Sequence, residues 1–292
     1  MAAGTQSAPE RSKVAGTGMR DRIMGWFAFA VLLLAAIVWL IPLAWAVDTA
    51  LKVESETTTV PVTWIPPSGF TLESFGEILA GGNMLRWYFN SFLTSSIITL
   101  AVVLLASLAA FGFSRIAFRG RRFLFFVIIA GLIIPPQILI VPLFTEMDAL
   151  GFVDTYWGII LPQIAAPIAV FIFKQFFDGL PHELEDAARV DGASRFRVYW
   201  QIWMPLSRPA IAAVGIFIFV ISWNNFLWPF IIVTNTDMMT IPVGIATVQS
   251  SYGVRYADIM ASAILGGLPL VIVFLFFQRQ IVQGIANTGL KS

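Results

Sequence analysis

The sequence has 292 residues, of which 58% are hydrophobic and 12% are charged, and its formal net charge is only +1. A typical soluble domain carries about 25% charged residues, and no soluble core of this length needs so much apolar surface, so the composition excludes a soluble protein and predicts an integral membrane one. The small net charge gives no indication of a nucleic-acid surface, and the absence of cysteine excludes disulfides and thiolate metal sites.

The chain begins with a polar tail, residues 1–22, that we expect to be disordered. The stretch that follows, 24–47, is long enough to cross the hydrocarbon layer as a helix, which takes about 20 apolar residues. We interpret it as a retained membrane helix and not as a cleaved signal peptide, because the polar tail is longer than the charged region of such a peptide.

Five more apolar stretches follow, and each is expected to be helical because lipid offers no partner to open backbone groups. In chain order they are 89–113, 123–144, 156–177, 210–233 and 259–277. The sequence therefore predicts an all-α integral membrane protein whose six transmembrane helices lie within residues 23–280. Prolines interrupt several stretches, among them Pro135-Pro136 and Pro269, and we expect kinks there, with hinges for alternating access as the sharper alternative.

The distribution of lysine and arginine predicts the orientation, because these residues concentrate in cytoplasmic segments. Of the 18 such residues, only Lys52, Arg86 and Arg255 lie on the opposite side from the rest. This asymmetry predicts a multi-pass protein with both termini in the cytoplasm. The segment 178–208 and the C-terminal tail 281–292 are then cytoplasmic as well.

Residues 178–208 form a polar, charged segment in an otherwise apolar chain. They predict a helix, a break and a second helix: acidic residues crowd the turn after Pro181, where the helix dipole favours them, Gly192 suits a left-handed helix stop, and Ser194 suits a second cap. The second helix carries an apolar stripe, formed by Phe196, Tyr199, Trp200 and Trp203. An amphipathic linker in the membrane interface is the alternative interpretation.

The same segment contains Asp186-Ala187-Ala188, then Gly192 after three residues, and then Ile202 and Met204-Pro205 after nine more. This spacing resembles the EAA motif of permease subunits in binding-protein-dependent ABC importers, which is E-A-A, three residues, G, nine residues, I-x-L-P. Asp replaces the usual Glu, and Met replaces Leu. The resemblance assigns contact with the ATPase to the following residues: Glu185, Asp186, Ala187, Ala188, Asp191, Gly192, Ala193, Ile202 and Pro205.

Other stretches resemble the carbohydrate branch of these importers, of the maltose or glycerol-phosphate type, including "LGFVDTYWGIILP", "WNNFLWP" and "QRQIVQGIANTGLKS". The resemblance implies a type I importer permease with a cytoplasmic helix-Gly-helix coupling element, a pore-forming subunit for a sugar or sugar-like solute. A glycerophosphodiester or glycerol phosphate is the alternative solute. The implied partners are a second homologous permease, an ATPase dimer that holds the ATP and Mg, an extracytoplasmic solute-binding lipoprotein and lipid. No cofactor is expected in this chain, and the implied location is the cytoplasmic (inner) membrane of a bacterium or archaeon.

Two further groups are candidates for contact with the solute or its carrier. Trp223, Asn224 and Asn225 lie in the middle of the stretch 210–233, where amides are costly unless they face protein or water. They predict either interhelical hydrogen bonds or a lining of the solute path. The resemblance also implies that residues of the last outer loop touch the binding protein, namely Gln249, Tyr252 and Arg255.

The sequence shows few of the features that other function classes need. An ATPase needs a glycine-rich loop ending in Gly-Lys-Ser/Thr, which the chain lacks, so we do not expect the chain itself to be an enzyme. A membrane-embedded glycosyltransferase needs paired carboxylates or a metal cluster, and the nearest acids, Glu146, Asp148 and Asp154, form no known pattern. A secondary carrier usually shows internal repeats and ionisable residues within its spans, and we find neither.

Overall fold

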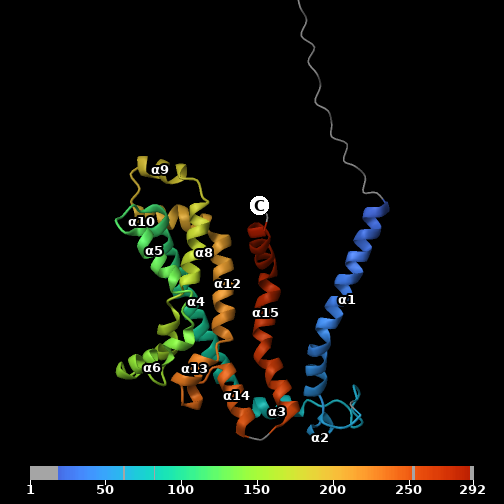
Figure 1. The fold of residues 1–292 in the computed structure, drawn as a ribbon. Helices are drawn as coiled ribbons and strands as arrows, with labels where there is room; N and C mark the ends of the chain where they lie inside the picture. The colour runs from blue at the N-terminus through green and yellow to red at the C-terminus, as the bar shows by residue number, and fades with distance from the viewer. Residues whose placement is uncertain (1–18, 62, 82, 252–253, 290–292) are drawn as a thin grey trace, which may run out of the picture.

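The computed structural model describes residues 19–289 apart from 62, 82, 252 and 253, and in these residues every regular element is helical. Three helices are long and apolar enough to cross a membrane alone: α1 (Met19–Ala50), α4 (Met84–Arg115) and α15 (Tyr256–Gly289). They cover the predicted stretches 24–47, 89–113 and 259–277. The helices α8 (Pro167–Asp178) and α12 (Arg208–Trp223) pack beside α4 (Figure 1).

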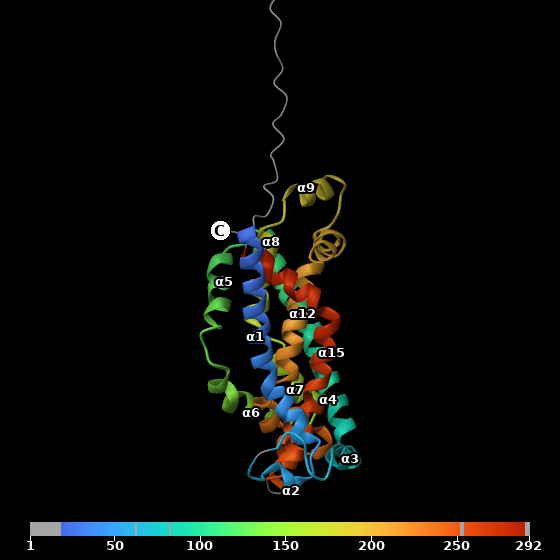
Figure 2. The same cartoon turned by 90° about the vertical axis from the view of Figure 1, so that its right-hand side faces the viewer.

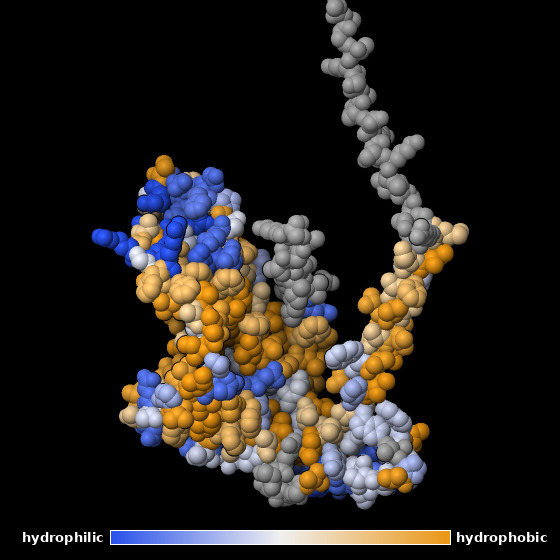
Figure 3. Space-filling view, viewed as in Figure 1, coloured by the Kyte–Doolittle hydropathy of each residue, from blue (hydrophilic) through white to orange (hydrophobic). Residues whose placement is uncertain are grey.

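The bundle has two ends of different composition. One end, the α9 end, carries α9 (Glu183–Val190) and α10 (Arg195–Val198), and both the start of α1 and the end of α15 point toward it (Figure 1). The opposite end, the α3 end, carries the short helices α2 (Glu54–Thr57), α3 (Glu73–Ala80), α13 (Leu227–Ile232), η4 (Thr236–Met238) and α14 (Ile241–Ser251). An apolar surface separates the polar α9 end from the α3 end (Figure 3).

The predicted third span, 123–144, is not one helix. The structure divides it into α5 (Arg121–Ala130), the 3-10 turn η1 (Pro136–Leu139) and α6 (Ile140–Ala149), with the chain descending from α5 to α6 through an open segment (Figure 2). Pro135 and Pro136 cause the break, because neither can donate a backbone hydrogen bond and each disfavours helix in the residue before it. The helix α6 also extends past residue 144 into the segment expected to be a loop.

The predicted fourth and fifth spans are also interrupted. α7 (Tyr156–Ile160) and the turn η2 (Leu161–Gln163) meet α8 at a bend of 46°, close to the prolines that the sequence shows there. The fifth helix, α12, ends at Trp223 instead of continuing to residue 233. Pro229 explains this end, because a continuous helix would bring its ring against the carbonyl group of Asn225.

The core of the molecule lies around α4, which packs against α8 and α12. The polar residues on α4 serve this packing. The side-chain amide of Asn90 donates to the backbone oxygens of Asp237 (2.8 Å) and Met239 (2.9 Å) and accepts a hydrogen bond from the hydroxyl of Tyr156 (2.8 Å). These bonds fix the segment after η4 against α4, so Asn90 is an interhelical hydrogen-bonding residue.

Candidate functional site

The polar segment at the α9 end begins with α9, whose ends follow local rules. Acidic residues occupy its first turn and Arg189 its last, as the helix dipole favours. Gly192 has φ of +79° and so occupies the left-handed region, as the sequence predicted. The amide of Ala193 bonds the carbonyl of Ala188 and the amide of Gly192 bonds that of Arg189, both at 3.0 Å, which together form a Schellman motif.

The second half of the segment departs from a regular helix. The side chain of Ser194 caps α10 by accepting from the amide of Arg197, as predicted. The chain then widens into a π-helix, η3 (Tyr199–Trp203), closed by a bond from the amide of Met204 to the carbonyl of Tyr199, before α11 (Met204–Leu206). The run of α10, η3 and α11 meets α12 at 77°, which makes the segment an elbow.

The predicted apolar stripe is therefore split. Tyr199 and Trp203 are fully buried, whereas Phe196 and Trp200 are 68% and 43% exposed. Only Tyr199 and Trp203 pack into the bundle, so the predicted stripe is buried along one edge and exposed along the other. Phe196 and Trp200 instead pair edge to face on the surface, with ring centroids 6.1 Å apart.

Buried aromatic rings join the elbow to the bundle. The hydroxyl of Tyr199 lies 2.8 Å from that of Ser107 on α4, and its ring packs on Phe111 of the same helix at 5.4 Å. Trp203 packs edge to face on Phe177 of α8 at 5.6 Å. A close-packed core is stiff, so the elbow and the two helices are expected to move as one body.

Arg115 is a second attachment point that sequence reasoning missed, because it counted this residue only as one of the basic residues that set orientation. Its guanidinium stacks 4.0 Å above the ring of Trp203 and donates to the backbone oxygens of Phe177 and Leu180. It also lies 2.6 Å from Nδ1 of His182. One side chain at the end of α4 therefore holds α8, the start of the polar segment and the π-helix together.

The structure separates the predicted coupling residues into two sets. Asp186, Ala187, Asp191, Gly192 and Pro205 are exposed. Glu185 is only 9% exposed, and Ala188, Ala193 and Ile202 pack against the core. Ala187 is exposed while Ala188 is half-buried against the core, because adjacent positions on a helix lie on different faces, and contact of either residue with the ATPase stays a prediction. Val190, which the sequence did not single out, is 88% exposed beside the acidic residues.

The residues predicted near the solute path do not form one surface. Trp223 is 3% exposed, and its Nε1 donates to the carbonyl of Gly266 on α15 at 3.2 Å. The amide of Asn225 donates to Gln163 at 2.7 Å, which supports the interhelical alternative for this residue. Asn224 is exposed at the end of α12 and bonds the carbonyl of Val220. α12 ends at Trp223, so the three residues lie at a helix break and not within one continuous helix, and their role in lining the solute path stays a prediction.

Of the residues predicted to touch a binding protein, Tyr252 and the side chain of Gln249 lie outside the described residues. Arg255 is at the α3 end, where its guanidinium pairs with Glu77 at 2.9 Å and with Asp258 at 3.0 Å. In the described part of the chain, histidines and acids form no group able to hold a metal ion.

Comparisons with known proteins identify the family of the chain. Residues 102–287 match the model of the family described as binding-protein-dependent transport system inner membrane component. The chain is 41% identical over 226 residues to the arabinooligosaccharides transport system permease protein AraQ of Halalkalibacterium halodurans, covering 77% of this chain and 81% of that one. It is 33% identical to the trehalose/maltose transport system permease protein MalG of Thermococcus litoralis, covering 92% and 95%.

The fold is also similar to that of a solved bacterial ABC transporter involved in the import of the acidic polysaccharide alginate. The TM-score is 0.76 at 20% sequence identity, with 90% of this chain and 98% of that chain covered. The predicted resemblance to carbohydrate importers is confirmed. The chain belongs to the inner membrane components of binding-protein-dependent transport systems, as a permease of the carbohydrate ABC importer type.

Proposed function

We propose that this permease passes a neutral sugar or oligosaccharide, delivered by an extracytoplasmic binding protein, and that partner ATPases drive it through the exposed face of α9. The observation that carries the proposal is that the elbow bearing this exposed polar helix is attached to α4 and α8 through the buried rings of Tyr199 and Trp203. Asp186, Ala187, Val190 and Asp191 form that exposed face. The arabino-oligosaccharide and trehalose/maltose permeases among the relatives support the solute class.

The proposed mechanism is a rigid transfer of motion. ATP binding closes the ATPase dimer, α9 moves with it, and the buried contacts of Arg115, Tyr199 and Trp203 pass the displacement to α4 and α8. A second permease subunit completes the path. Shifting a two-state bundle from 1:99 to 99:1 takes about 5.5 kcal/mol, and only a difference in affinity between the two states supplies it. The α9 end then faces the cytoplasm, as the basic residues predict.

Gly192 offers the sharpest test of coupling, because its φ of +79° is closed to most residues and no atom lies within 4 Å of an added Cβ. A change there acts on the backbone of the elbow alone. Proline requires φ near −65°, so Gly192→Pro should break the Schellman motif. We expect sugar uptake and binding-protein-stimulated ATPase activity to fall at least about tenfold in proteoliposomes holding the assembled transporter.

Gly192→Asn is the matched control, since asparagine tolerates the left-handed conformation best among residues with a side chain. It should retain most of the uptake. Wild-type coupling in Gly192→Pro would show that the elbow does not transmit the motion.

A further inference from the structure

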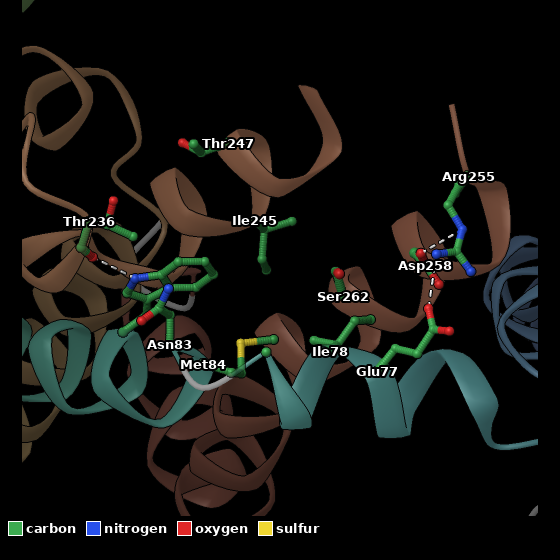
Figure 4. A pocket seen from close by; sticks show the side chains of 12 residues that line it. Glu77, Ile78, Asn83, Met84, Thr236, Ile245, Thr247, Arg255, Asp258 and Ser262 are labelled. Carbon is green, nitrogen blue, oxygen red and sulfur yellow. Dashed lines mark hydrogen bonds and ion pairs between the residues drawn. The ribbon is translucent and has the colours of Figure 1, made fainter. Parts of the chain in front are cut away.

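A cavity of about 410 Å³ opens at the α3 end, between α3, the start of α4, α14 and the start of α15 (Figure 4). Small-molecule sites usually measure about 300–1,000 Å³. The cavity lies at the opposite end of the bundle from the elbow, where the proposed orientation places the entry of solute. Its lining combines acids, an amide and apolar side chains, and this chemistry identifies the class of ligand.

Several polar groups around the cavity are left without a partner. Oδ1 of Asp258 is buried and accepts no hydrogen bond from any described residue. Asn83 precedes α4, yet its side chain does not cap the helix. Only Oε2 of Glu77 engages Arg255. A buried acceptor without a donor, such as Oδ1 of Asp258, is rare in folded proteins and needs an explanation. A ligand rich in hydroxyl groups could donate to it and also bond the more exposed Asn83 and Glu77.

An apolar wall faces these groups. Figure 4 shows Ile78, Met84 and Ile245 between the Arg255 group and Asn83. Trp87 also belongs to the lining, and its Nε1 donates a 2.8 Å hydrogen bond to the carbonyl of Thr236. The ring of Trp87 packs directly on the backbone of Gly244, because a Cβ added there would lie 2.2 Å from the ring. Acceptors on one side and apolar atoms on the other match a sugar, whose hydroxyl edges and C–H faces differ in the same way.

The charge of the cavity distinguishes between sugars. Its charged lining residues are Glu77, Asp258 and one cation, Arg255, which leaves one negative charge in excess. Burial alone would lower the pKa of Arg255, but its hydrogen bond to Glu77 and the nearby acids raise that pKa, so the guanidinium stays charged and engaged. No cation is therefore free for an anionic ligand, and a uronic acid would be repelled.

We infer that this cavity binds one unit of a neutral saccharide as it enters the permease, and that it discriminates against acidic sugars. The inference rests on the proposed function, because it takes the α3 end to be the entry. It assigns Asn83, Glu77 and Asp258 as hydrogen-bonding residues and the half-buried Ile78 and Ile245 as the apolar face, whereas Trp87 belongs to the lining but is only 4% exposed. The elbow takes no part, and of the predicted binding-protein contacts Arg255 lines the cavity.

The test uses the assembled transporter in nanodiscs, without binding protein, and saturation-transfer NMR titrations with maltose, arabinose and glucuronate. We expect transfer to maltose or arabinose and about tenfold weaker binding of glucuronate. Asn83→Ala should weaken binding of the neutral sugars by about tenfold, the loss of one hydrogen bond. Because the Asn83 side chain makes no hydrogen bond, this variant should fold. Asp258→Asn should reduce the discrimination against glucuronate, a change that misfolding cannot produce.

Thr145→Val on α6 is the matched control, since it removes an exposed hydroxyl from the same end, away from the cavity. Equal sugar binding by the Asn83→Ala and Thr145→Val variants would overturn the inference. Sugar binding that appears only when the binding protein is present would also overturn it, because the cavity would then be a contact site for that protein. Binding-protein-stimulated ATPase activity is measured on the same wild-type sample. Its absence would count against the proposed function, whereas its presence without sugar binding would count against the cavity alone.

Discussion

Arg115 shows how one residue can decide the connection between elements. Its planar guanidinium stacks on Trp203 while one terminal nitrogen donates to the backbone oxygens of Phe177 and Leu180 and the other lies beside His182. Lysine cannot reproduce both contacts, because its charge is a point and its donors are not arranged in a plane. We expect Arg115→Lys and Arg115→Gln to lower the sugar transported per ATP hydrolysed severalfold, and Arg115→Gln to lower stability by about 1–3 kcal/mol.

The ratio of uptake to ATP hydrolysis, measured in proteoliposomes with all subunits, separates coupling from folding. A merely structural role would reduce uptake and hydrolysis together and leave their ratio unchanged. Such a constant ratio in Arg115→Lys would remove Arg115 from the coupling path. Arg119, a basic residue of the same α4–α5 connection with no described partner, supplies the control Arg119→Lys, which should behave as wild type.

Asp154 predicts a pH dependence at the α3 end. Burial raises the pKa of its carboxyl group. Hydrogen bonds from the amide of Asn235 and from the hydroxyl and amide of Thr234 lower that pKa by more than burial raises it, so the net direction is down. A carboxylate with a lowered folded-state pKa stabilises the fold at pH above its unfolded value, and this contribution is lost as pH falls through the folded value. The melting temperature should therefore drop as the pH falls below about 4.

Asp154→Asn isolates this contribution. Asparagine tolerates the φ of +55° found at this position, so the variant should lose stability at neutral pH without adding backbone strain. Its melting temperature should fall less than that of the wild type over the same acid range. Identical acid profiles for the two proteins would show that another carboxylate controls the response.

At the scale of elements, two neighbouring glycines report on the packing of α14 against α15. A Cβ on Gly266 would lie 2.8 Å from the Cδ1 atom of Ile245, whereas nothing lies within 4 Å of one on Gly267. We expect Gly266→Ala to cost about 1 kcal/mol, because the end of the flexible Ile245 side chain must move aside, and Gly267→Ala to be neutral or slightly stabilising, since alanine favours helix. Melting curves of the purified permease complex measure both. Equal effects would mean that α14 does not press on α15.

The elements also show how much of the fold can be predicted from the sequence. Local signals sufficed for Gly192, Ser194 and the breaks at prolines, because backbone conformation there depends on neighbours in sequence. They did not suffice for the π-helix or for the inward position of Ala188, which follow from packing against α4 and α8. Pairings such as Arg115 with Trp203, or Asn83 with Asp258 around one cavity, join residues far apart in the chain, and no periodicity records them.

The whole molecule is an incomplete bundle. Much of α1 is exposed and apolar on every side, and the exposed apolar residues of α5, including Phe123 and Phe126, leave a second broad surface uncovered. A helix that is apolar all round needs lipid or another membrane helix beside it. Composition predicted this class of protein, and the uncovered apolar surfaces are compatible with the proposed second permease.

The orientation of the whole molecule can be tested directly, because the chain contains no cysteine and single thiols can be introduced cleanly. Val190 is 88% exposed at the α9 end and Leu72 is 69% exposed at the α3 end. A membrane-impermeant maleimide should label Leu72→Cys in intact spheroplasts and Val190→Cys only after permeabilisation. In permeabilised cells, coexpression of the partner ATPases should protect Val190→Cys from labelling but leave Leu72→Cys unchanged, because the proposed contact covers α9 alone. Labelling of Val190→Cys in intact spheroplasts would place the elbow outside and remove the basis for coupling through α9.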